Sequence, residues 1–303
     1  MRAWTKIALF LLSFGFCQVQ AQDDLMNLLE DQANDRTEYT FATFKSTRLV
    51  SGHSIETNGE GVLQFMIMHR FGRVNNGWRD LWGIDNASVR LGLEYGLTDD
   101  LNIGFGRSSF GKVFDFTAKY KFLKQKKGAR NFPFTATLVS VAYLQATEWA
   151  DPERENLFSS RLSYHNALLI ARKFKDISVQ LMPTLVHRNL VATEADENSV
   201  FSMGFGASTQ VSPSVRLNVE YFYLLPDQIA SEIGGEEATN TLSFGVDIET
   251  GGHVFQLHIT NSRGMTERFL ATETTGDFLE GDIHFGFNVS RVFTLKKPKP
   301  FRK

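Results

Sequence analysis

Residues 281–293 read GDIHFGFNVSRVF, and their side chains alternate in character. Apolar residues occupy every second position from Ile283 onward, with Arg291 as the one exception, and polar residues or glycine fill the positions between them as far as Ser290. A period of two residues is typical of a β-strand that has one apolar and one polar face. We therefore predict a strand here, with Asp282 and His284 on its polar face.

The same alternation recurs in eleven further segments. They are residues 62–71, 87–95, 101–108, 112–122, 132–144, 160–172, 176–188, 200–209, 215–223, 241–249 and 252–261. Most approach the roughly 9–11 residues with which a tilted strand crosses a bilayer. Short turns alternate with longer polar connections near 145–158, 189–197, 225–237 and 262–280. This pattern predicts a closed antiparallel transmembrane β-barrel of about twelve strands, with short periplasmic turns and longer extracellular loops.

A soluble β-sandwich is the main alternative, because its strands also alternate apolar and polar residues. Two features of the strands favour the barrel. Their polar faces carry full charges, such as Arg90 and Glu94, and aromatic residues such as Tyr95, Phe122 and Tyr223 fall near strand ends. Membrane barrels place aromatic girdles at those positions.

The N-terminus reads as an export signal. Residues 1–21, MRAWTKIALFLLSFGFCQVQA, combine a positively charged start with a short apolar stretch, and cleavage is expected after Ala21. The apolar stretch is well short of the ~20 residues that a membrane-spanning helix needs. We expect a protein of the cell outer membrane, with residues 22–60 as a periplasmic leader or lumenal plug, 61–294 as the barrel and 295–303 as a basic periplasmic tail.

Composition excludes several classes of protein. The chain has 32 Lys plus Arg against 34 Asp plus Glu, so it has no basic field for nucleic acid. Its one Cys, Cys17, rules out a disulfide scaffold and a cysteine metal site, and we expect no cofactor. No catalytic set is complete: the residue two positions after His165 is Ala167, which has no hydroxyl nucleophile. His253 and His258 lie on opposite faces of one strand, so they cannot hold one metal ion together.

Charged residues of both signs fall on the polar, inward faces of the predicted strands. They are Arg70, Arg90, Glu94, Asp115, Lys119, Lys121, Arg216, Glu220 and Asp282. Unpaired charges in a narrow lumen are costly, so a structural ion-pair network that fills the barrel is the favoured interpretation. The alternative is a ring of charges that selects solutes along an aqueous path.

Residues 41–121 resemble an uncharacterised family of Gram-negative outer-membrane β-barrel proteins, a domain of unknown function. The likeness rests on ATFKSTR at 42–48, SIE at 54–56, HRFG at 69–72, WGIDNA at 82–87, RLGLEYG at 90–96, IGFGRS at 103–108, Asp115, and KYK at 119–121. The N-terminal motif consists of Phe44, Lys45, Thr47, Arg48 and Glu56. The resemblance implies the barrel fold and an envelope location, but it brings no activity and no catalytic residues.

Three functions remain open. The first is a non-enzymatic pore for small solutes, or a transport-associated envelope component. The second is a surface enzyme that acts on lipid or protein, and the third is a docking barrel whose periplasmic ends, 22–60 and 294–303, hold a periplasmic protein partner. The expected partners otherwise are outer-membrane lipid and the barrel-assembly machinery, because the last strand ends in an aromatic residue, Phe293, and is similar to the signal that this machinery reads.

Overall fold

The computed structural model describes residues 36–149 and 151–296. The predicted signal peptide at 1–21, the first part of the leader and most of the basic tail lie outside the described residues. Contacts divide the chain into two units, one containing 36–40 with 125–133 and the other containing 41–124 with 134–296.

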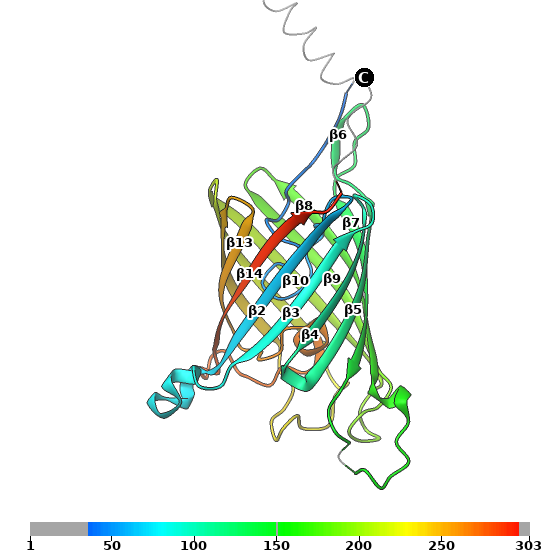
Figure 1. Cartoon of the computed structure of the whole chain (residues 1–303), viewed down its shortest axis with the longest axis vertical. Coiled ribbons are helices and arrows are strands. Elements are labelled where there is room, and N and C mark those ends of the chain that lie inside the picture. The colour runs from blue at the N-terminus through cyan, green and yellow to red at the C-terminus, as the bar shows by residue number, and fades with distance from the viewer. Residues whose placement is uncertain (1–35, 150, 297–303) are drawn as a thin grey trace, which may run out of the picture. The chain divides into compact units, whose positions relative to one another are not determined.

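Twelve antiparallel strands of the larger unit form a closed barrel, which confirms the predicted fold (Figure 1). In chain order they are β2 (Val62–Arg73), β3 (Ser88–Gly96), β4 (Leu101–Ser108), β5 (Val113–Leu123), β7 (Thr135–Gln145), β8 (Leu162–Phe174), β9 (Ile177–Arg188), β10 (Ser199–Ser212), β11 (Val215–Leu224), β12 (Thr241–Thr250), β13 (His253–Thr260) and β14 (His284–Thr294). Each strand pairs with its neighbour in sequence, and β14 pairs with β2 to close the ring.

The two ends of the barrel differ as expected. Tight turns such as 97–100 and 213–214 lie at one end, called the turn end here, and most of the long connections lie at the other, the loop end (Figure 1). Short helices in these connections are η1 (Val74–Asn76), η2 (Trp78–Gly83), η3 (Phe110–Lys112), η4 (Phe158–Arg161) and α2 (Glu267–Thr272). In outer-membrane barrels the turns face the periplasm and the loops face outward.

The connection from β5 to β7 contains an additional strand. Here β6 (Lys126–Gly128) pairs antiparallel with β1 (Thr37–Tyr39), and the two strands form the small separate unit. The predicted strand at 132–144 therefore begins only at Thr135.

The predicted strand at 281–293 begins instead at His284. Asp282 lies in the preceding loop, where its carboxylate accepts hydrogen bonds from Asn75 Nδ2 (2.6 Å) and the Asp277 backbone N–H (3.0 Å). The predicted strand thus begins three residues before the hydrogen-bonded ladder of the sheet.

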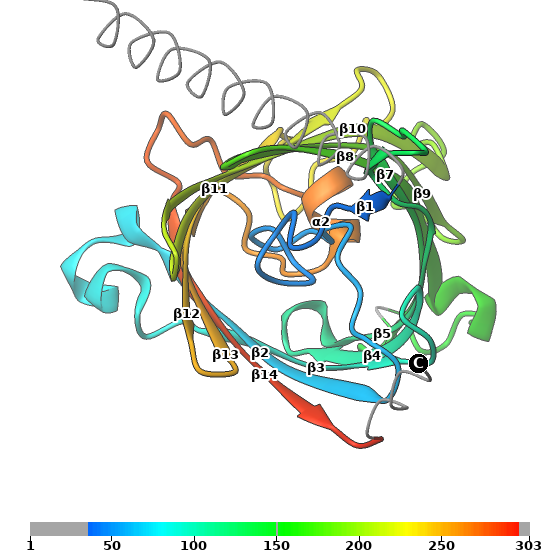
Figure 2. The ribbon, with the colours of Figure 1, turned by 90° about the horizontal axis from the view of Figure 1, so that it is seen from above.

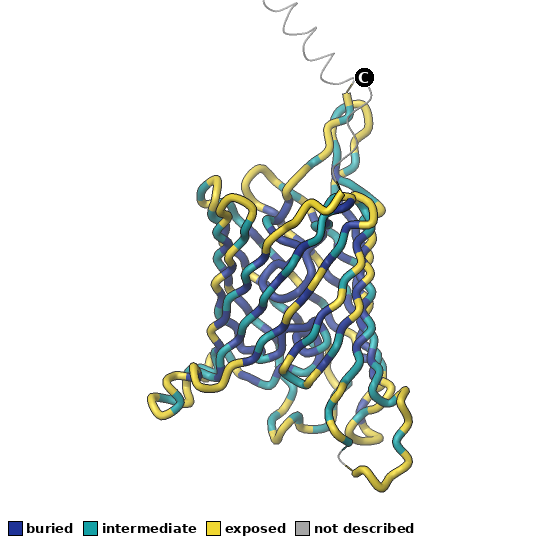
Figure 3. The backbone as a smooth tube through the Cα atoms, viewed as in Figure 1, coloured by how far each residue is buried: buried dark blue, intermediate teal, exposed yellow. Residues whose placement is uncertain are grey.

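The alternation places apolar residues outside and polar residues inside. Outward side chains such as Phe105, Phe116 and Phe205 are exposed, whereas inward ones such as Asp115 and Gln180 are buried (Figure 3). The exposed apolar girdle matches the hydrocarbon core of a bilayer. Among residues 36–149 and 151–296, no helix has both the length and the apolar content needed for a membrane span.

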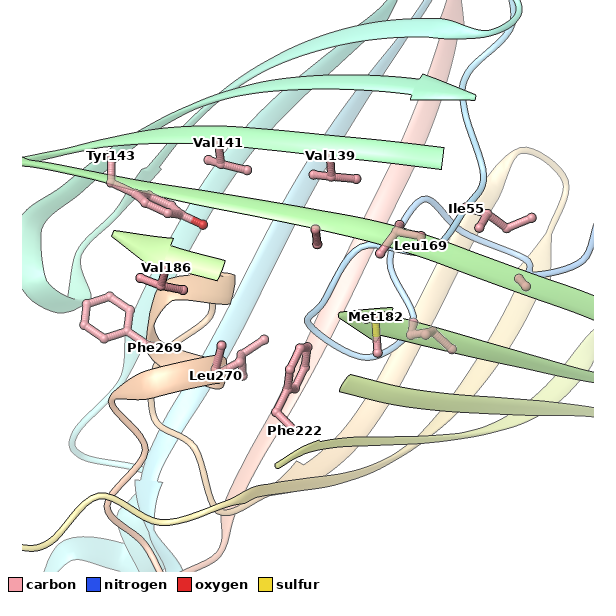
Figure 4. Close-up of a cluster of buried hydrophobic side chains, with 14 of the residues drawn as sticks. Ile55, Val139, Val141, Tyr143, Leu169, Met182, Val186, Phe222, Phe269 and Leu270 are labelled. Atoms are coloured by element: carbon pink, nitrogen blue, oxygen red, sulfur yellow. The ribbon is translucent and has the colours of Figure 1, made fainter. Parts of the chain in front are cut away.

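Two segments occupy the inside of the barrel. Residues 41–60, called the plug here, and α2 both lie within the ring of strands when the barrel is seen along its axis (Figure 2). An apolar cluster joins them to one side of the wall (Figure 4): Phe44, Leu49 and Ile55 of the plug and Phe269 and Leu270 of α2 belong to it. Burial of each such side chain stabilises the fold by about 1.5–3 kcal/mol.

Candidate functional site

The plug enters from the turn end and folds into a tight turn inside the lumen. The Leu49 N–H donates to the Gly52 carbonyl at 2.9 Å, and the Ser54 N–H donates to the Thr47 carbonyl at 3.0 Å. From residue 46 to residue 55 every side chain is buried. These backbone bonds leave the apex of the turn, residues 50–52, with N–H groups that need acceptors from elsewhere.

Glu220 on β11 supplies those acceptors. Its carboxylate accepts hydrogen bonds from the N–H groups of Val50 (3.3 Å), Ser51 (3.3 Å) and Gly52 (2.9 Å). A Cβ at position 52 would lie 3.0 Å from Oε2 of Glu220, so glycine permits this close approach. Glu220 was predicted as a lumenal charge, and its partner is the backbone of the plug instead of an arginine.

Arg48 connects the plug to α2. Its guanidinium forms an ion pair with Glu267, lies 3.5 Å from Glu94 on β3, and donates to the Ser51 carbonyl at 3.0 Å. Tyr143 Oη on β7 donates to the same Glu267 carboxylate at 3.1 Å. The two inserted segments therefore meet at one buried ion pair.

Lys119 on β5 binds two carbonyls of the plug. Its Nζ donates to the Glu56 carbonyl at 2.6 Å and to the Thr47 carbonyl at 3.2 Å. The Glu56 carboxylate lies 3.7 Å from Lys121 Nζ and accepts a hydrogen bond from the Phe44 N–H at 3.1 Å. The N-terminal motif of the sequence is thus brought together with the lumenal charges.

The remaining predicted charges are paired within the wall, bound to the plug, or located outside the lumenal strands. Arg90 and Asp115 pair within the wall, with Nε–Oδ1 and Nη2–Oδ2 distances of 2.9 and 2.6 Å. Arg216 donates to the Thr43 carbonyl at 2.6 Å, and Arg70 donates to Ser51 Oγ at 2.7 Å.

Asp282 is the predicted charge that the structure removes from the lumenal strands, since it lies in the loop and 3.5 Å from Arg73. Lys45 lies at the turn end, where it pairs with Glu249 and donates to the Pro213 carbonyl at 3.1 Å.

Neutral amides complete the attachment, and sequence reasoning missed them. Gln180 accepts from the Ile55 N–H (2.9 Å) and donates to the His53 carbonyl (2.8 Å). Gln256 donates to the Leu49 carbonyl at 2.9 Å and Asn288 to the Val50 carbonyl at 2.7 Å. Their place on the polar face of a strand was the available signal, but nothing local distinguishes an amide that binds a plug from one that contacts water.

Glu267 was also missed, because it lies in a long loop without strand periodicity. Its position against Arg48 follows only from the inward fold of that loop.

His284 and Asp282, which share the predicted polar face, do not pair with each other in the described part of the chain. His284 Nδ1 contacts the Phe71 carbonyl at 2.9 Å, and Asp282 is bound to loop residues instead. Within the part of the chain that the structure describes, no group of three His, Cys, Asp or Glu side chains is arranged to hold a metal ion. The arrangement as a whole is a polar lumen filled by a segment of the same chain.

A closed twelve-stranded barrel with an apolar outer girdle and a polar interior defines an outer-membrane β-barrel. Residues 44–293 match the family described as "Membrane bound beta barrel domain (DUF5777)", a domain of unknown function, and the chain belongs to this family. The predicted resemblance is confirmed, and it extends well beyond residues 41–121.

Solved outer-membrane barrels are similar in fold. The COG4313 outer membrane channel from Pseudomonas putida F1 is 13% identical, with a TM-score of 0.50, and the match covers 79% of this chain and 98% of that one. The NanC porin is 8% identical, with a TM-score of 0.47 and coverage of 78% and 100%. No curated protein matches this chain significantly in sequence.

Proposed function

We propose that this protein is a gated outer-membrane channel for small solutes, closed by its own residues 41–60. The observation that carries the proposal is the way in which the plug is held. Wall side chains such as Glu220, Lys119 and Asn288 bind its backbone through hydrogen bonds. Each of these groups would remain a polar lining for water and solutes if the plug withdrew, so the closed and open states could share one wall.

The apolar contacts of the plug are concentrated on one side. Its apolar residues belong to one cluster with β7, β8 and β9, including Val139, Leu169 and Met182, and with Phe222 of β11 (Figure 4). The opposite wall holds the plug mainly through hydrogen bonds, whose net contribution is about 0.5–1.5 kcal/mol each and about 1.5–3 kcal/mol where Glu220 or Lys119 takes part. This asymmetry supports a plug that separates from the hydrogen-bonding part of the wall while it stays against the apolar cluster.

A disulfide between plug and wall tests the proposal. The only natural cysteine, Cys17, lies in the predicted signal peptide, so introduced pairs are unambiguous. A Cβ on Gly245 would lie 3.1 Å from Cγ2 of Val50, and Cγ2 lies where the sulfur of a cysteine at position 50 could lie, so the two positions are close enough for a disulfide. The double variant Val50→Cys with Gly245→Cys should conduct in a planar bilayer when reduced, fall silent when oxidised, and recover on addition of reductant.

Each single cysteine variant is the control and should conduct regardless of reductant. Equal conductance of the oxidised and reduced double variant would contradict gating by the plug. Absence of conductance in both the unaltered protein and the reduced variant would contradict the channel itself.

A further inference from the structure

A cavity of about 350 Å³ opens among the loops at the loop end of the barrel. Its walls come from the connections 74–87, 225–240 and 261–283, together with the adjoining ends of β2 and β14. The volume falls in the range of about 300–1,000 Å³ that is typical of small-molecule sites.

The charged groups of the cavity are paired with one exception. Arg73 Nη1 donates to Glu236 Oε1 at 2.6 Å, and this bond holds the pKa of the Glu236 carboxyl below its ordinary value. Glu273 Oε1 lies 2.9 Å from Arg268 Nε and 3.8 Å from Arg188. Among the described residues, no carboxylate lies within 4 Å of Arg263, so this guanidinium lacks a counter-charge.

Arg263 is nevertheless held in place. Its Nη2 donates to Asn86 Oδ1 at 2.6 Å, and its guanidinium carbon lies 5.2 Å above the ring of Phe110. Its Nε is buried and has no hydrogen-bond partner among the described groups. A positioned guanidinium that lacks a counter-charge is suited to bind a planar carboxylate.

The lining also includes neutral polar side chains. Asn76, Asn86 and Thr275 contribute amide and hydroxyl groups, which pair with hydroxyl groups of a solute. We propose that this cavity binds a small organic carboxylate that carries hydroxyl groups, with Arg263 bound to the carboxylate. The inference that this carboxylate is the solute of the channel rests on the proposed function. Binding of the carboxylate to the cavity can be measured without any conduction.

The site also lies next to the attachment of the plug. The Gly264 carbonyl, adjacent to Arg263, accepts a hydrogen bond from Arg70 Nη1 at 3.3 Å, and Arg70 Nη2 donates to Ser51 Oγ of the plug. A solute bound at Arg263 would therefore lie next to Gly264, whose carbonyl binds Arg70, and Arg70 also binds the plug.

The test is isothermal titration calorimetry of the mature protein, residues 22–303, in detergent. Gluconate is the hydroxylated carboxylate. Sorbitol is the matched neutral polyol, and inorganic phosphate is an anion without the carbon chain. Gluconate should bind at least about tenfold more tightly than sorbitol and than phosphate, a difference of about 1.4 kcal/mol. Equal binding of gluconate and sorbitol would overturn the role of the charge, and equal binding of gluconate and phosphate would overturn the role of the hydroxyl groups.

Variants assign the binding to this cavity. Arg263→Gln should weaken gluconate binding at least about tenfold, and Arg263→Lys should give an intermediate affinity because it keeps the charge. Arg172→Gln is the matched control, since Arg172 also lies over an aromatic ring, Phe174, but at the turn end. Unchanged binding in Arg263→Gln, with the barrel shown to be folded by its unheated gel mobility, would overturn the site regardless of whether the protein conducts.

Discussion

Buried charges in this barrel are satisfied in two chemically different ways. Arg48 is balanced by the carboxylates of Glu267 and Glu94, whereas Glu220 is balanced by backbone N–H groups of the plug. Desolvation of an ion costs several kcal/mol, and ion pairs or multiple hydrogen bonds offset that cost. Removal of one partner therefore leaves a buried charge unpaired, and the desolvation cost of that charge is much larger than the net stabilisation by the contact.

Arg48→Gln should loosen the plug markedly. The change leaves two buried carboxylates, Glu267 and Glu94, without their cation, and loss of one partner of a buried pair costs about 3–5 kcal/mol. Native-state hydrogen exchange of the amides at 46–55 measures the free energy of opening directly. Lys124→Gln is the control, because Lys124 pairs with Asp100 at 2.6 Å in an exposed position worth about 0–1 kcal/mol. Unchanged exchange in Arg48→Gln would contradict this account of the ion pair.

Asp196 predicts a pH dependence of the loops at the loop end. Burial by itself would raise the pKa of its carboxyl, but hydrogen bonds from Ser231 and Thr193 outweigh that effect and hold the pKa well below its ordinary value. A carboxyl with a depressed pKa stabilises the folded state above its ordinary pKa of about 3.9, and this contribution is lost as the pH falls through the lower folded-state value.

Protection of the Ala230 and Ser231 amides, both bound by Asp196 at 2.9 Å, should thus persist down to about pH 4 and decline only below it. Asp196→Asn should reduce their protection already at neutral pH, because the hydrogen bonds lose the charge of the carboxylate and the amide Nδ2 would face the Thr193 donors. A loss of protection between pH 6 and 5 in the unaltered protein would show that another group controls the loops. The measurement is the protection factor from exchange at each pH.

The exit of the plug depends on close backbone contact between two elements. A Cβ on Gly96, at the end of β3, would lie 2.1 Å from the carbonyl oxygen of Gly59. The Gly61 N–H also donates to the Gly96 carbonyl at 2.9 Å. Glycine at position 96 therefore lets the plug run directly along the end of a wall strand.

Gly96→Ala should force these segments apart. Overpacking of this kind costs about 1–3 kcal/mol, and the gain in exchange should be confined to residues 58–61. Gly59→Ala is the matched control, because a Cβ there would meet its nearest atom at 3.6 Å and has room. Equal exchange in the two variants would contradict the close contact as the reason for glycine.

At the scale of the whole molecule, the stability of the barrel in the membrane depends on apolar side chains that face the bilayer and polar side chains that face the lumen. Phe205, in the middle of β10, points outward and is 44% exposed, while Phe201 lies near the loop end of the same strand and is 53% exposed. Both belong to the girdle, but they differ in their distance from the bilayer midplane.

Phe205→Arg should destabilise the barrel by about 2–4 kcal/mol, whereas Phe201→Arg should cost only about 0–1 kcal/mol because it lies near the interface. Urea unfolding in lipid vesicles, followed by tryptophan fluorescence, measures both values. Similar costs at the two positions would mean that the lipid does not cover β10 as the exposed girdle indicates.

The strands, their number and their two faces could be predicted because alternation is a local property. Every second residue of β5, from Asp115 to Lys119, points inward whatever the rest of the chain does, since successive side chains of a strand point to opposite faces. The same reasoning was wrong at Asp282, because the alternation of side chains in the sequence includes this residue although the hydrogen-bonded strand begins only at His284. The role of residues 41–60 stayed open between leader and plug because that segment has no period at all.

Only the tertiary structure shows which segments fill the interior of the barrel. The partners of the plug come from strands as far away in sequence as β11 and β14, and the Arg48–Glu267 pair joins residues 219 positions apart. Local periodicity follows from bond geometry and is therefore visible in a short stretch of letters. The satisfaction of buried polar groups is a condition on the whole enclosed volume, so it is met only when all twelve strands have closed around it.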